Sequence, residues 1–283
     1  MPSLSLLSQS ILSGVFVGAL YGLMGLGLGL SWGLLRLINL AHFAFAFLAA
    51  YLCFQLAAMG MDPLLTLPIL VPLFFVLGAA LHWVMARFAI SPFNSLLLTF
   101  GLTGIAESLI QSIWTADFRK LESRYAQLKF KVGELYVPVP ELITLVLACA
   151  LCFALWAVLR YTDLGRAMRA AAQDAPVAAA FGVNEKALGL LLAGTCAGLA
   201  SVAGVCVALS FTLAPSQMYA WIGVVFAAVM LGGLGSALGP LVAGVLIGVS
   251  EAVTMAVTAP SWAPIVSFTL LILILLLRPG KST

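Results

Sequence analysis

The sequence carries very little charge. Asp, Glu, Lys and Arg make up 8% of its 283 residues, whereas an ordinary soluble domain has roughly 25%. Hydrophobic residues reach 63%, and the mean hydropathy is +1.17. So few charges cannot cover the core of a soluble protein of this length. The composition excludes a soluble fold and indicates a polytopic membrane protein.

Motifs for catalysis and nucleotide binding are also missing. The sequence has no G-x-S-x-G, no H-E-x-x-H and no G-x-x-x-x-G-K-[ST] pattern. Its two histidines, His42 and His82, lack Asp, Glu or Cys at ligand spacing, which argues against a metal site. No Lys/Arg block points to nucleic acid. We therefore expect a non-enzyme without cofactor or metal. If the protein works with ATP, another chain must hydrolyse it.

The five cysteines all lie in apolar runs, which favours small buried hydrophobic side chains over redox chemistry. This holds even for the C-x-x-C pattern of Cys149 and Cys152, which falls inside a predicted membrane helix. Residues 1–10 have no basic segment of the kind that opens a cleaved signal peptide. We expect the first span to stay in place.

Long apolar runs fill most of the chain. A membrane helix needs about 20 apolar residues, and these runs are continuous rather than alternating, which favours helices over a barrel. We predict an all-α fold, a single transmembrane bundle over residues 1–283 with eight or nine spans. Residues 231–240 are either a tight turn or a re-entrant break. The spans lie near 11–33, 38–59, 63–87, 94–115, 139–160, 187–210, 220–233, 237–258 and 262–277.

Glycines recur along one face of the first span. Their steps of 4, 4, 3, 4 and 4 run through Gly14, Gly18, Gly22, Gly25, Gly29 and Gly33. Small faces let membrane helices approach closely, and the pairs Gly194/Gly198 and Gly244/Gly248 repeat the pattern. Close packing is the simpler interpretation, and a helix that slides during transport is the alternative.

The segment 160–187 is polar although apolar spans flank it. We predict two short helices, the first capped by Asp163 and the second by Asp174 with Pro176 in its first turn. Gly182 ends the second helix, and Asn184 caps the next span. Arg166 and Arg169 share a face of the first helix. Such an element suits docking to another protein; a solvated connector is the alternative.

Basic residues in the loops suggest an orientation. With segment 160–187 in the cytoplasm, eight Lys/Arg lie inside: Arg36, Arg87, Arg160, Arg166, Arg169, Lys186, Arg278 and Lys281. Five lie outside: Arg119, Lys120, Arg124, Lys129 and Lys131. The same orientation makes 116–138 an extracellular loop, which we expect to form a docking rim.

Two glutamates fall inside predicted spans. Glu107 and Glu251 are costly in lipid, so a functional role is the default hypothesis. Each either binds a proton or a substrate amine, or stabilises the structure through hydrogen bonds.

The polar segment 162–182 resembles the ATPase-contacting loop of LivH-type permeases, the branched-chain amino acid ABC importers of bacteria. Further resemblance is carried in the same order by Arg36–His42, Ala50–Tyr51, Phe226–Ser236, Gly248–Ala252 and Leu277–Gly280. The wider group includes importers of urea, amides and aromatic acids.

The resemblance implies a multi-pass permease subunit in the bacterial inner membrane, surrounded by lipid. Its implied partners are a second, LivM-like permease, two ATPase subunits that hold ATP and Mg, and a periplasmic substrate-binding protein. The cargo would be an amino acid or a related small carboxylate or amide. The implied coupling loop is 161–186, and its ATPase-coupling residues are Asp163, Gly165, Arg166, Arg169, Ala170, Asp174, Ala178, Ala179 and Gly182.

The second span lies near the pathway by the same resemblance, around Asn39 and His42. Relatives usually carry glycine at the positions of Phe43 and Ala49. Phe43 and Phe47 share a helical face, which would narrow the pathway and favour a bulky or aromatic carboxylate. The alternative is that both rings face lipid or a neighbouring helix. We include Glu107 and Glu251 among the candidate pathway residues. An ion-coupled secondary transporter is the alternative function.

Overall fold

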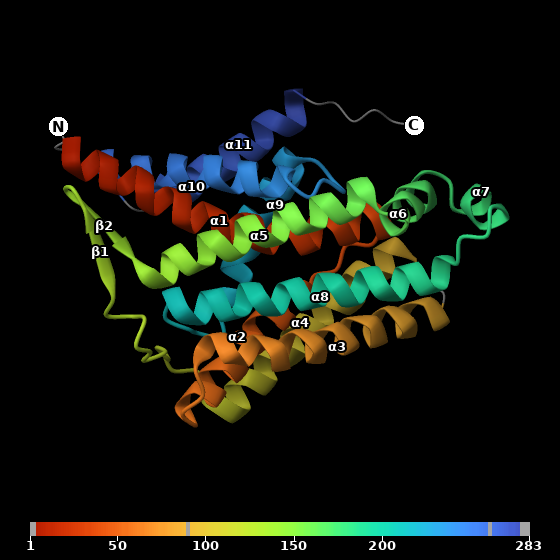
Figure 1. Ribbon diagram of the computed structural model, residues 1–283, viewed down its shortest axis with the longest axis horizontal. Helices are drawn as coiled ribbons and strands as arrows, with labels where there is room; N and C mark the ends of the chain where they lie inside the picture. Colours follow the sequence, from red (N-terminus) through yellow and green to blue (C-terminus); the bar gives the residue numbers. More distant parts are fainter. Residues whose placement is uncertain (1–3, 89–90, 260–261, 278–283) are drawn as a thin grey trace.

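The computed structural model describes residues 4–88, 91–259 and 262–277. Arg278 and Lys281, which entered the orientation count, lie outside these residues, as does the end of the tail motif at Gly280. The described chain is a bundle of helices with one small hairpin (Figure 1). Its elements are α1 (Leu4–Leu35), α2 (Ala41–Ala58), η1 (Pro63–Thr66), α3 (Leu67–Arg87), α4 (Pro92–Trp114), β1 (Lys129–Val132), β2 (Leu135–Pro138), α5 (Val139–Tyr161), α6 (Asp163–Gln173), α7 (Ala175–Ala180), α8 (Glu185–Ser210), α9 (Gln217–Gly232), α10 (Gly239–Val257) and α11 (Ala263–Leu277).

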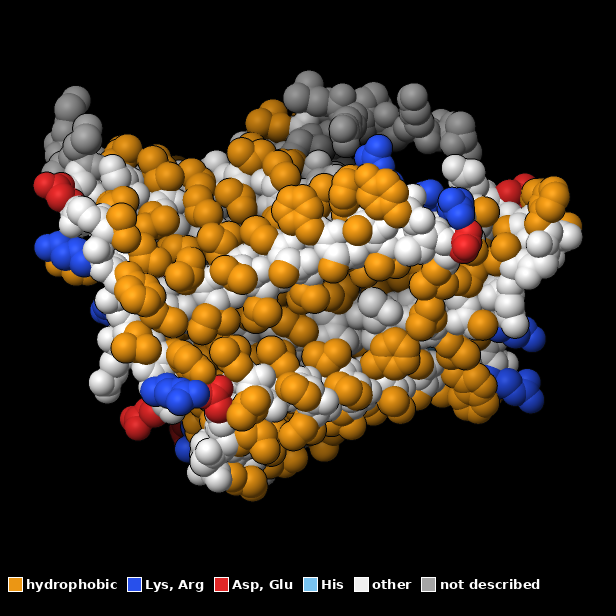
Figure 2. Space-filling view, viewed as in Figure 1, with side chains coloured by type: hydrophobic (Ala, Val, Ile, Leu, Met, Phe, Trp, Pro, Cys, Tyr) orange, Lys and Arg blue, Asp and Glu red, His pale blue; other side chains and the backbone are white. Residues whose placement is uncertain are grey.

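The long helices run between two ends of the molecule. The hairpin and the start of α1 mark one end, and α6 and α7 mark the other (Figure 1). We call these the hairpin end and the α6–α7 end. In Figure 2 charged side chains gather at both ends, and an apolar surface covers the helices between them. That distribution is what a bilayer requires of a spanning bundle.

Seven helices in the described part of the chain are long and apolar enough to cross a membrane. They are α1, α2, α3 with η1, α4, α5, α8 and α10. The apolar α9 is shorter, with 16 residues, and α11 has 15. A multi-pass helical membrane protein is therefore confirmed, while the count of eight or nine spans stays a prediction.

The core is centred on α1, α2 and α8. On α8 a continuous run from Cys196 to Leu209 is buried, and the large buried side chains of α2 lie beside it. The α1 glycines pack against α10 so closely that a Cβ on Gly18 would lie 2.5 Å from the Val245 Cα. A Cβ on Gly14 would lie 2.6 Å from the Val249 Cα. The glycine face thus serves close helix packing.

One helix boundary differs from the sequence prediction, and one open alternative is decided. Helix α2 starts at Ala41 rather than near residue 38 because the preceding residues leave the helical conformation at Arg36, whose φ is 55°. The glycine-rich run is a turn between α9 and α10, with positive φ at Gly233 and Gly235. The Gly235 N–H donates to the Gly29 carbonyl over 3.0 Å, so this turn packs on α1.

The loop 116–138 holds the antiparallel pair β1–β2, which an all-α prediction did not include. Arg119 also pairs with Leu213 through two backbone hydrogen bonds.

Candidate functional site

Helices α6 and α7 form the predicted two-helix element. The cap of α6 differs from the prediction: the Gly165 N–H donates to the Thr162 hydroxyl over 3.1 Å. Thr162 has extended backbone, so its side chain reaches back to the first turn. Asp163 is the first helical residue instead, and its carboxylate pairs with Arg166.

The other predicted caps are confirmed. The Asp174 carboxylate accepts from the Val177 N–H over 3.1 Å, and Pro176 stands in the first turn of α7. Gly182 follows α7 with φ 87°, a conformation that glycine adopts without steric cost. Asn184 caps α8 through the Ala187 N–H over 3.1 Å.

Most of the predicted coupling residues are exposed, but Gly165 and Ala178 are not. A Cβ on Gly165 would lie 2.5 Å from the Leu159 Cα, so this glycine packs α6 onto α5. Ala178 is 4% exposed. These two residues hold the element to its own chain and present no surface to a partner. The exposed members of the set are Asp163, Arg166, Arg169, Ala170, Asp174, Ala179 and Gly182.

Apolar side chains on this element point outward, which the sequence reasoning missed. Phe181 is 86% exposed, Val177 51% and Leu164 37%. This end of the bundle lies beyond the apolar surface and among charged residues (Figure 2). The signal in the sequence was a phenylalanine inside a segment rich in small and polar residues. Exposed apolar side chains in water mark a binding surface.

The Arg36 side chain connects α6 to the non-helical residues 36–40 that precede α2. Its guanidinium donates to the Ala172 carbonyl over 2.8 Å and to the Gln173 carbonyl over 3.5 Å. Both carbonyls belong to the last turn of α6, where the helix leaves acceptors free and favours a cation.

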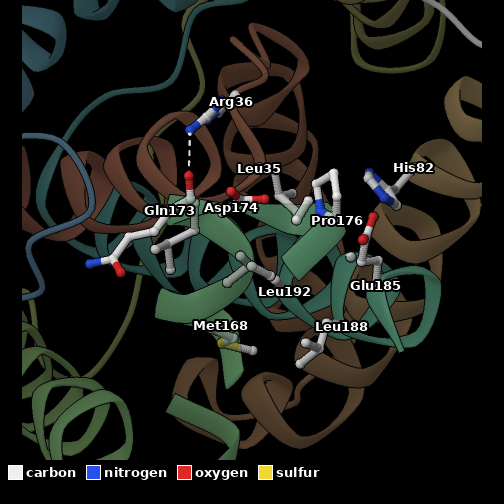
Figure 3. Close-up of a pocket in the computed structure, with 14 residues that line it drawn as sticks. Leu35, Arg36, His82, Met168, Gln173, Asp174, Pro176, Glu185, Leu188 and Leu192 are labelled. Carbon is white, nitrogen blue, oxygen red and sulfur yellow. Dashed lines mark hydrogen bonds between the residues drawn. The ribbon is translucent and has the colours of Figure 1, made fainter. Parts of the chain in front are cut away.

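A cavity of about 400 Å³ lies beside this contact, between α6–α7 and the bundle. Figure 3 shows the side chains around it, among them His82 from α3 and Glu185 from α8, with the Arg36 hydrogen bond drawn. The two-helix element α6–α7 therefore contacts the bundle through the Arg36 hydrogen bonds and through the packing of α6 on α5. The cavity lies between the element and the rest of the bundle.

The residues 36–40 turn back along the last turns of α1. The Ser31 hydroxyl donates to the Leu37 carbonyl over 3.4 Å, and His42 Nε2 lies 3.0 Å from the Met24 carbonyl. The Leu40 N–H donates to the Thr99 hydroxyl over 3.1 Å. Helix α2 therefore begins inside the bundle, an arrangement that transporters use at substrate sites. The Asn39 Oδ1 atom is buried there and has no hydrogen-bond partner among the described residues.

Phe43 and Phe47 do not line an opening in this arrangement. Both are 0% exposed and belong to the central core, and His42 is 2% exposed. The structure favours the alternative in which the two rings pack on neighbouring helices. A pathway narrowed by these rings, and the aromatic substrate inferred from it, stay predictions without support from this arrangement.

The two membrane glutamates have different surroundings. Glu251 of α10 is 8% exposed, and the Tyr21 hydroxyl donates to it over 3.0 Å. The Ser267 hydroxyl of α11 also donates to Glu251. Glu107 of α4 lies on a half-exposed side and accepts from Gln111 over 3.2 Å. Glu251 therefore ties three helices together, whereas Glu107 faces away from the core.

At the hairpin end, Asp62 connects the α2–α3 turn to the loop 116–138. Its carboxylate pairs with Arg124 and accepts from the Tyr125 hydroxyl over 2.9 Å. Burial raises the pKa of Asp62, but hydrogen bonds from Tyr125, Leu64 and Arg124 outweigh it, so the pKa lies below the usual 3.8.

The fold and these contacts define a polytopic helical membrane protein with a two-helix element at one end. A model of the family "Branched-chain amino acid transport system / permease component" matches residues 10–275. The chain therefore belongs to this family of transport permeases.

Among its relatives are two LivH proteins, the high-affinity branched-chain amino acid transport system permease proteins of Salmonella typhimurium and Escherichia coli. Each is 28% identical over 96% of this chain and 93% of its own length. BraD of Pseudomonas aeruginosa, named as the same kind of permease, is 28% identical over 99% of this chain and 96% of its length. No solved structure is significantly similar to the chain.

Proposed function

We propose that the chain is a permease subunit of an ATP-driven importer in the bacterial inner membrane, with its α6–α7 end in the cytoplasm. Two ATPase subunits would hold ATP and Mg and dock on α6–α7. A second, LivM-like permease would complete the channel, and a periplasmic binding protein would deliver substrate to the hairpin end. Family membership supports the transport role.

One observation carries the ATPase-docking proposal: α6–α7 exposes Phe181, at 86%, and this element forms one of the two ends of the bundle where charged side chains gather (Figure 2). Val177 lies one helical turn before Phe181 and is also exposed, and Leu164 is a further exposed apolar side chain at the start of α6. Neighbouring exposed apolar side chains on such an element favour a docking surface over a solvated connector.

Arg36 supplies a route from that surface to the interior. A displacement of α6 moves the Ala172 carbonyl, which Arg36 binds. Arg36 is the first of the non-helical residues 36–40. The last of them, Leu40, is hydrogen-bonded to Thr99 of α4. Force on α6–α7 therefore reaches Asn39 and the start of α2 within five residues of chain. Coupling requires that the partner binds the two conformations of this route differently.

For the substrate we propose an amino acid with an aliphatic side chain. The named relatives are branched-chain amino acid permeases. Phe43 stands where relatives usually carry glycine. It gives no reason to propose a different substrate, because its ring is buried in the helix core. Binding assays on the cognate periplasmic protein test this: tight binding of leucine, isoleucine or valine is expected, and exclusive binding of an aromatic acid would contradict it.

The docking surface is tested by Phe181→Ser in the complete importer, reconstituted in liposomes. We expect ATP-driven uptake to fall by about tenfold, because the apolar contact with the ATPase is lost. Phe88→Ser is the matched control: Phe88 is 73% exposed where α3 ends, outside α6–α7. Equal uptake in the Phe181 variant and the wild type would contradict docking at this surface.

The coupling route is tested by Arg36→Met, which keeps the apolar stem and removes the guanidinium. We expect ATP hydrolysis to continue while uptake falls by about tenfold, the effect of losing hydrogen bonds from a charged donor. Parallel loss of hydrolysis and uptake would instead show that Arg36 serves assembly.

Glu107 keeps an ion-coupled secondary transporter as the second candidate, because it is an acidic side chain on an exposed side of a membrane helix. Uptake that stops when the proton gradient is collapsed, but ignores ATP, would favour this alternative.

A further inference from the structure

A second pocket, of about 260 Å³, lies between α3 and α8. It is found where α3 ends and α8 begins, at the α6–α7 end of the bundle (Figure 1). Each helix contributes one cation to its lining, Arg87 from α3 and Lys186 from α8, and both side chains are exposed. The pocket is distinct from the cavity of Figure 3, although His82 lines both.

The two cations are not neutralised within the described part of the chain. Neither Arg87 nor Lys186 forms an ion pair with a residue that the structure describes. Glu185 precedes Lys186 in the sequence but lines the other cavity, so the described lining of this pocket holds no carboxylate. Two cations on facing walls without an acid are complementary to a phosphate group.

The back of the pocket is fixed by close packing. A Cβ on Gly189 of α8 would lie 2.5 Å from His82 Nε2, so the imidazole rests directly on the α8 backbone. The His82 Nδ1 atom is buried and has no hydrogen-bond partner among the described residues. The walls that carry Arg87 and Lys186 are thus held together behind the two cations.

An exposed stripe of α3 leads along the helix to this pocket. Its members recur at steps of four, three, four, three and four, so they share one side of the helix. They are Ile69, Leu73, Val76, Ala80, Trp83 and Arg87, and all are exposed. Val76 is 63% exposed and Trp83 is 58% exposed. The stripe is apolar for most of its length and ends in a tryptophan and an arginine.

The order of residues on this stripe matches the layers of a membrane. The span Pro63–Arg87 has 25 residues, which extend over roughly 37 Å. The hydrocarbon layer is about 30 Å thick, so Arg87, at the end of the span, reaches the headgroup layer. Tryptophan is typical of the boundary between the two layers, and Trp83 lies one turn before Arg87. The apolar part of the stripe therefore lies beside acyl chains.

We infer that this pocket binds the headgroup of an anionic phospholipid. Its phosphate contacts Arg87 and Lys186, and one acyl chain lies along the α3 stripe. Basic pockets between membrane helices bind acidic headgroups in this way. A free phosphate ion would use the two cations but leave the stripe unexplained. The bound lipid joins the end of α3 to the start of α8, whether or not α6–α7 docks an ATPase.

The site is tested with phosphatidylglycerol that carries a photoreactive group in its acyl chain, close to the glycerol. The protein is purified from its host with the subunits it retains and placed in lipid nanodiscs that contain this probe. Mass spectrometry then compares adducts on residues 76–87 with adducts on α4. Helix α4 is the internal reference for unselective lipid contact, because only 17% of its apolar window is buried. We expect the adducts to be enriched on 76–87.

Three single variants separate a site from general surface charge. Arg87→Gln and Lys186→Gln should each lower the enrichment by about fivefold, the effect of removing one cation beside an acidic headgroup. Arg87→Lys should keep most of it. Arg160→Gln is the matched control, since Arg160 is an exposed cation in the last turn of α5, at the same end of the bundle and outside the pocket. It should label like the wild type.

Four outcomes contradict the inference. Equal enrichment with phosphatidylcholine that carries the same photoreactive group would show that the pocket does not select an anionic lipid. An equal loss in Arg160→Gln would show that only the total surface charge matters. Loss of the enrichment in millimolar inorganic phosphate would assign the two cations to a free anion. Adducts on α4 with none on 76–87 would show that a protein subunit covers the stripe and the pocket.

Discussion

Glu251 of α10 and Glu107 of α4 place the same residue type in opposite surroundings. Glu251 is enclosed by α1, α10 and α11 and receives hydrogen bonds from Tyr21 and Ser267. Glu107 lies on a half-exposed side next to glycines with free space. A carboxylate inside a membrane span therefore has two distinct uses. Glu251 joins three helices in the core, and Glu107 bonds to Gln111 one turn along its own helix at the outside of the bundle.

The largest expected difference in stability is between a side chain added to the closely packed glycines of α1 and one added to Gly101 of α4. Gly18→Leu forces a side chain onto the backbone of α10, where a Cβ alone would lie 2.5 Å from the Val245 Cα. We expect a loss of about 3 kcal/mol in the free energy of unfolding, or no folded protein. Thermal melting in detergent measures it, with Gly101→Leu as the control that should melt like the wild type. Equal melting temperatures of the two variants would contradict the difference between the packed Gly18 and the unpacked Gly101.

Replacing the glutamates should give the next largest difference. Glu251→Ala leaves the Tyr21 and Ser267 hydroxyls without their acceptor in a buried place, which costs about 2 kcal/mol. Glu107→Ala removes no buried partner from this chain, so its stability should stay within about 0.5 kcal/mol of the wild type. Chemical unfolding of each purified chain measures both. A larger loss for Glu107→Ala would mean that the chain itself depends on that carboxylate.

The smallest effect is expected at the loop that follows α4, where Asp62 holds Arg124 and Tyr125. The pKa of Asp62 is lowered in the folded protein. Its stabilising contribution is therefore present above the ordinary pKa of 3.8 and is lost as the pH falls through the folded value. Protease cleavage within 116–128 should therefore stay constant near neutral pH and rise only below about pH 4.

Asp62→Asn is the matched control for this loop. It should raise cleavage at neutral pH and remove the rise in acid, because the amide has no charge to titrate. Salt should also raise cleavage in the wild type, since the Arg124 side chain is 73% exposed. A wild-type loop whose cleavage increases between pH 8 and pH 5 would contradict control by Asp62.

Much of the fold was predictable from particular residues. Asp174, Gly182 and Asn184 act on neighbours within a few positions, so their roles at helix ends follow from local chemistry. Asp163 was misassigned for an equally local reason, because Thr162 one residue earlier has a hydroxyl that competes for the same N–H. The start of α2 could not be predicted, since residues 36–40 are held by Ser31 and Thr99 from two other segments.

The candidate sites were less predictable. Phe43 and Phe47 share a helical face, and nothing local distinguishes a core from a pathway. The hydrogen bonds of Arg36 join residues more than 130 positions apart, so no spacing rule could have found them. Phe181 was visible as an apolar residue in a polar segment, but its exposure depends on how α7 projects from the bundle.

The sequence by itself determined that this chain spans a membrane as a bundle of helices, because long apolar runs without charge have no other stable form. It also determined where most helices start and stop. Only the tertiary structure decided which side of each helix faces the core. Lipid and protein interior are both apolar, so hydrophobic patterning marks no inward direction. The difference between Glu107 and Glu251 appears only when distant helices come together.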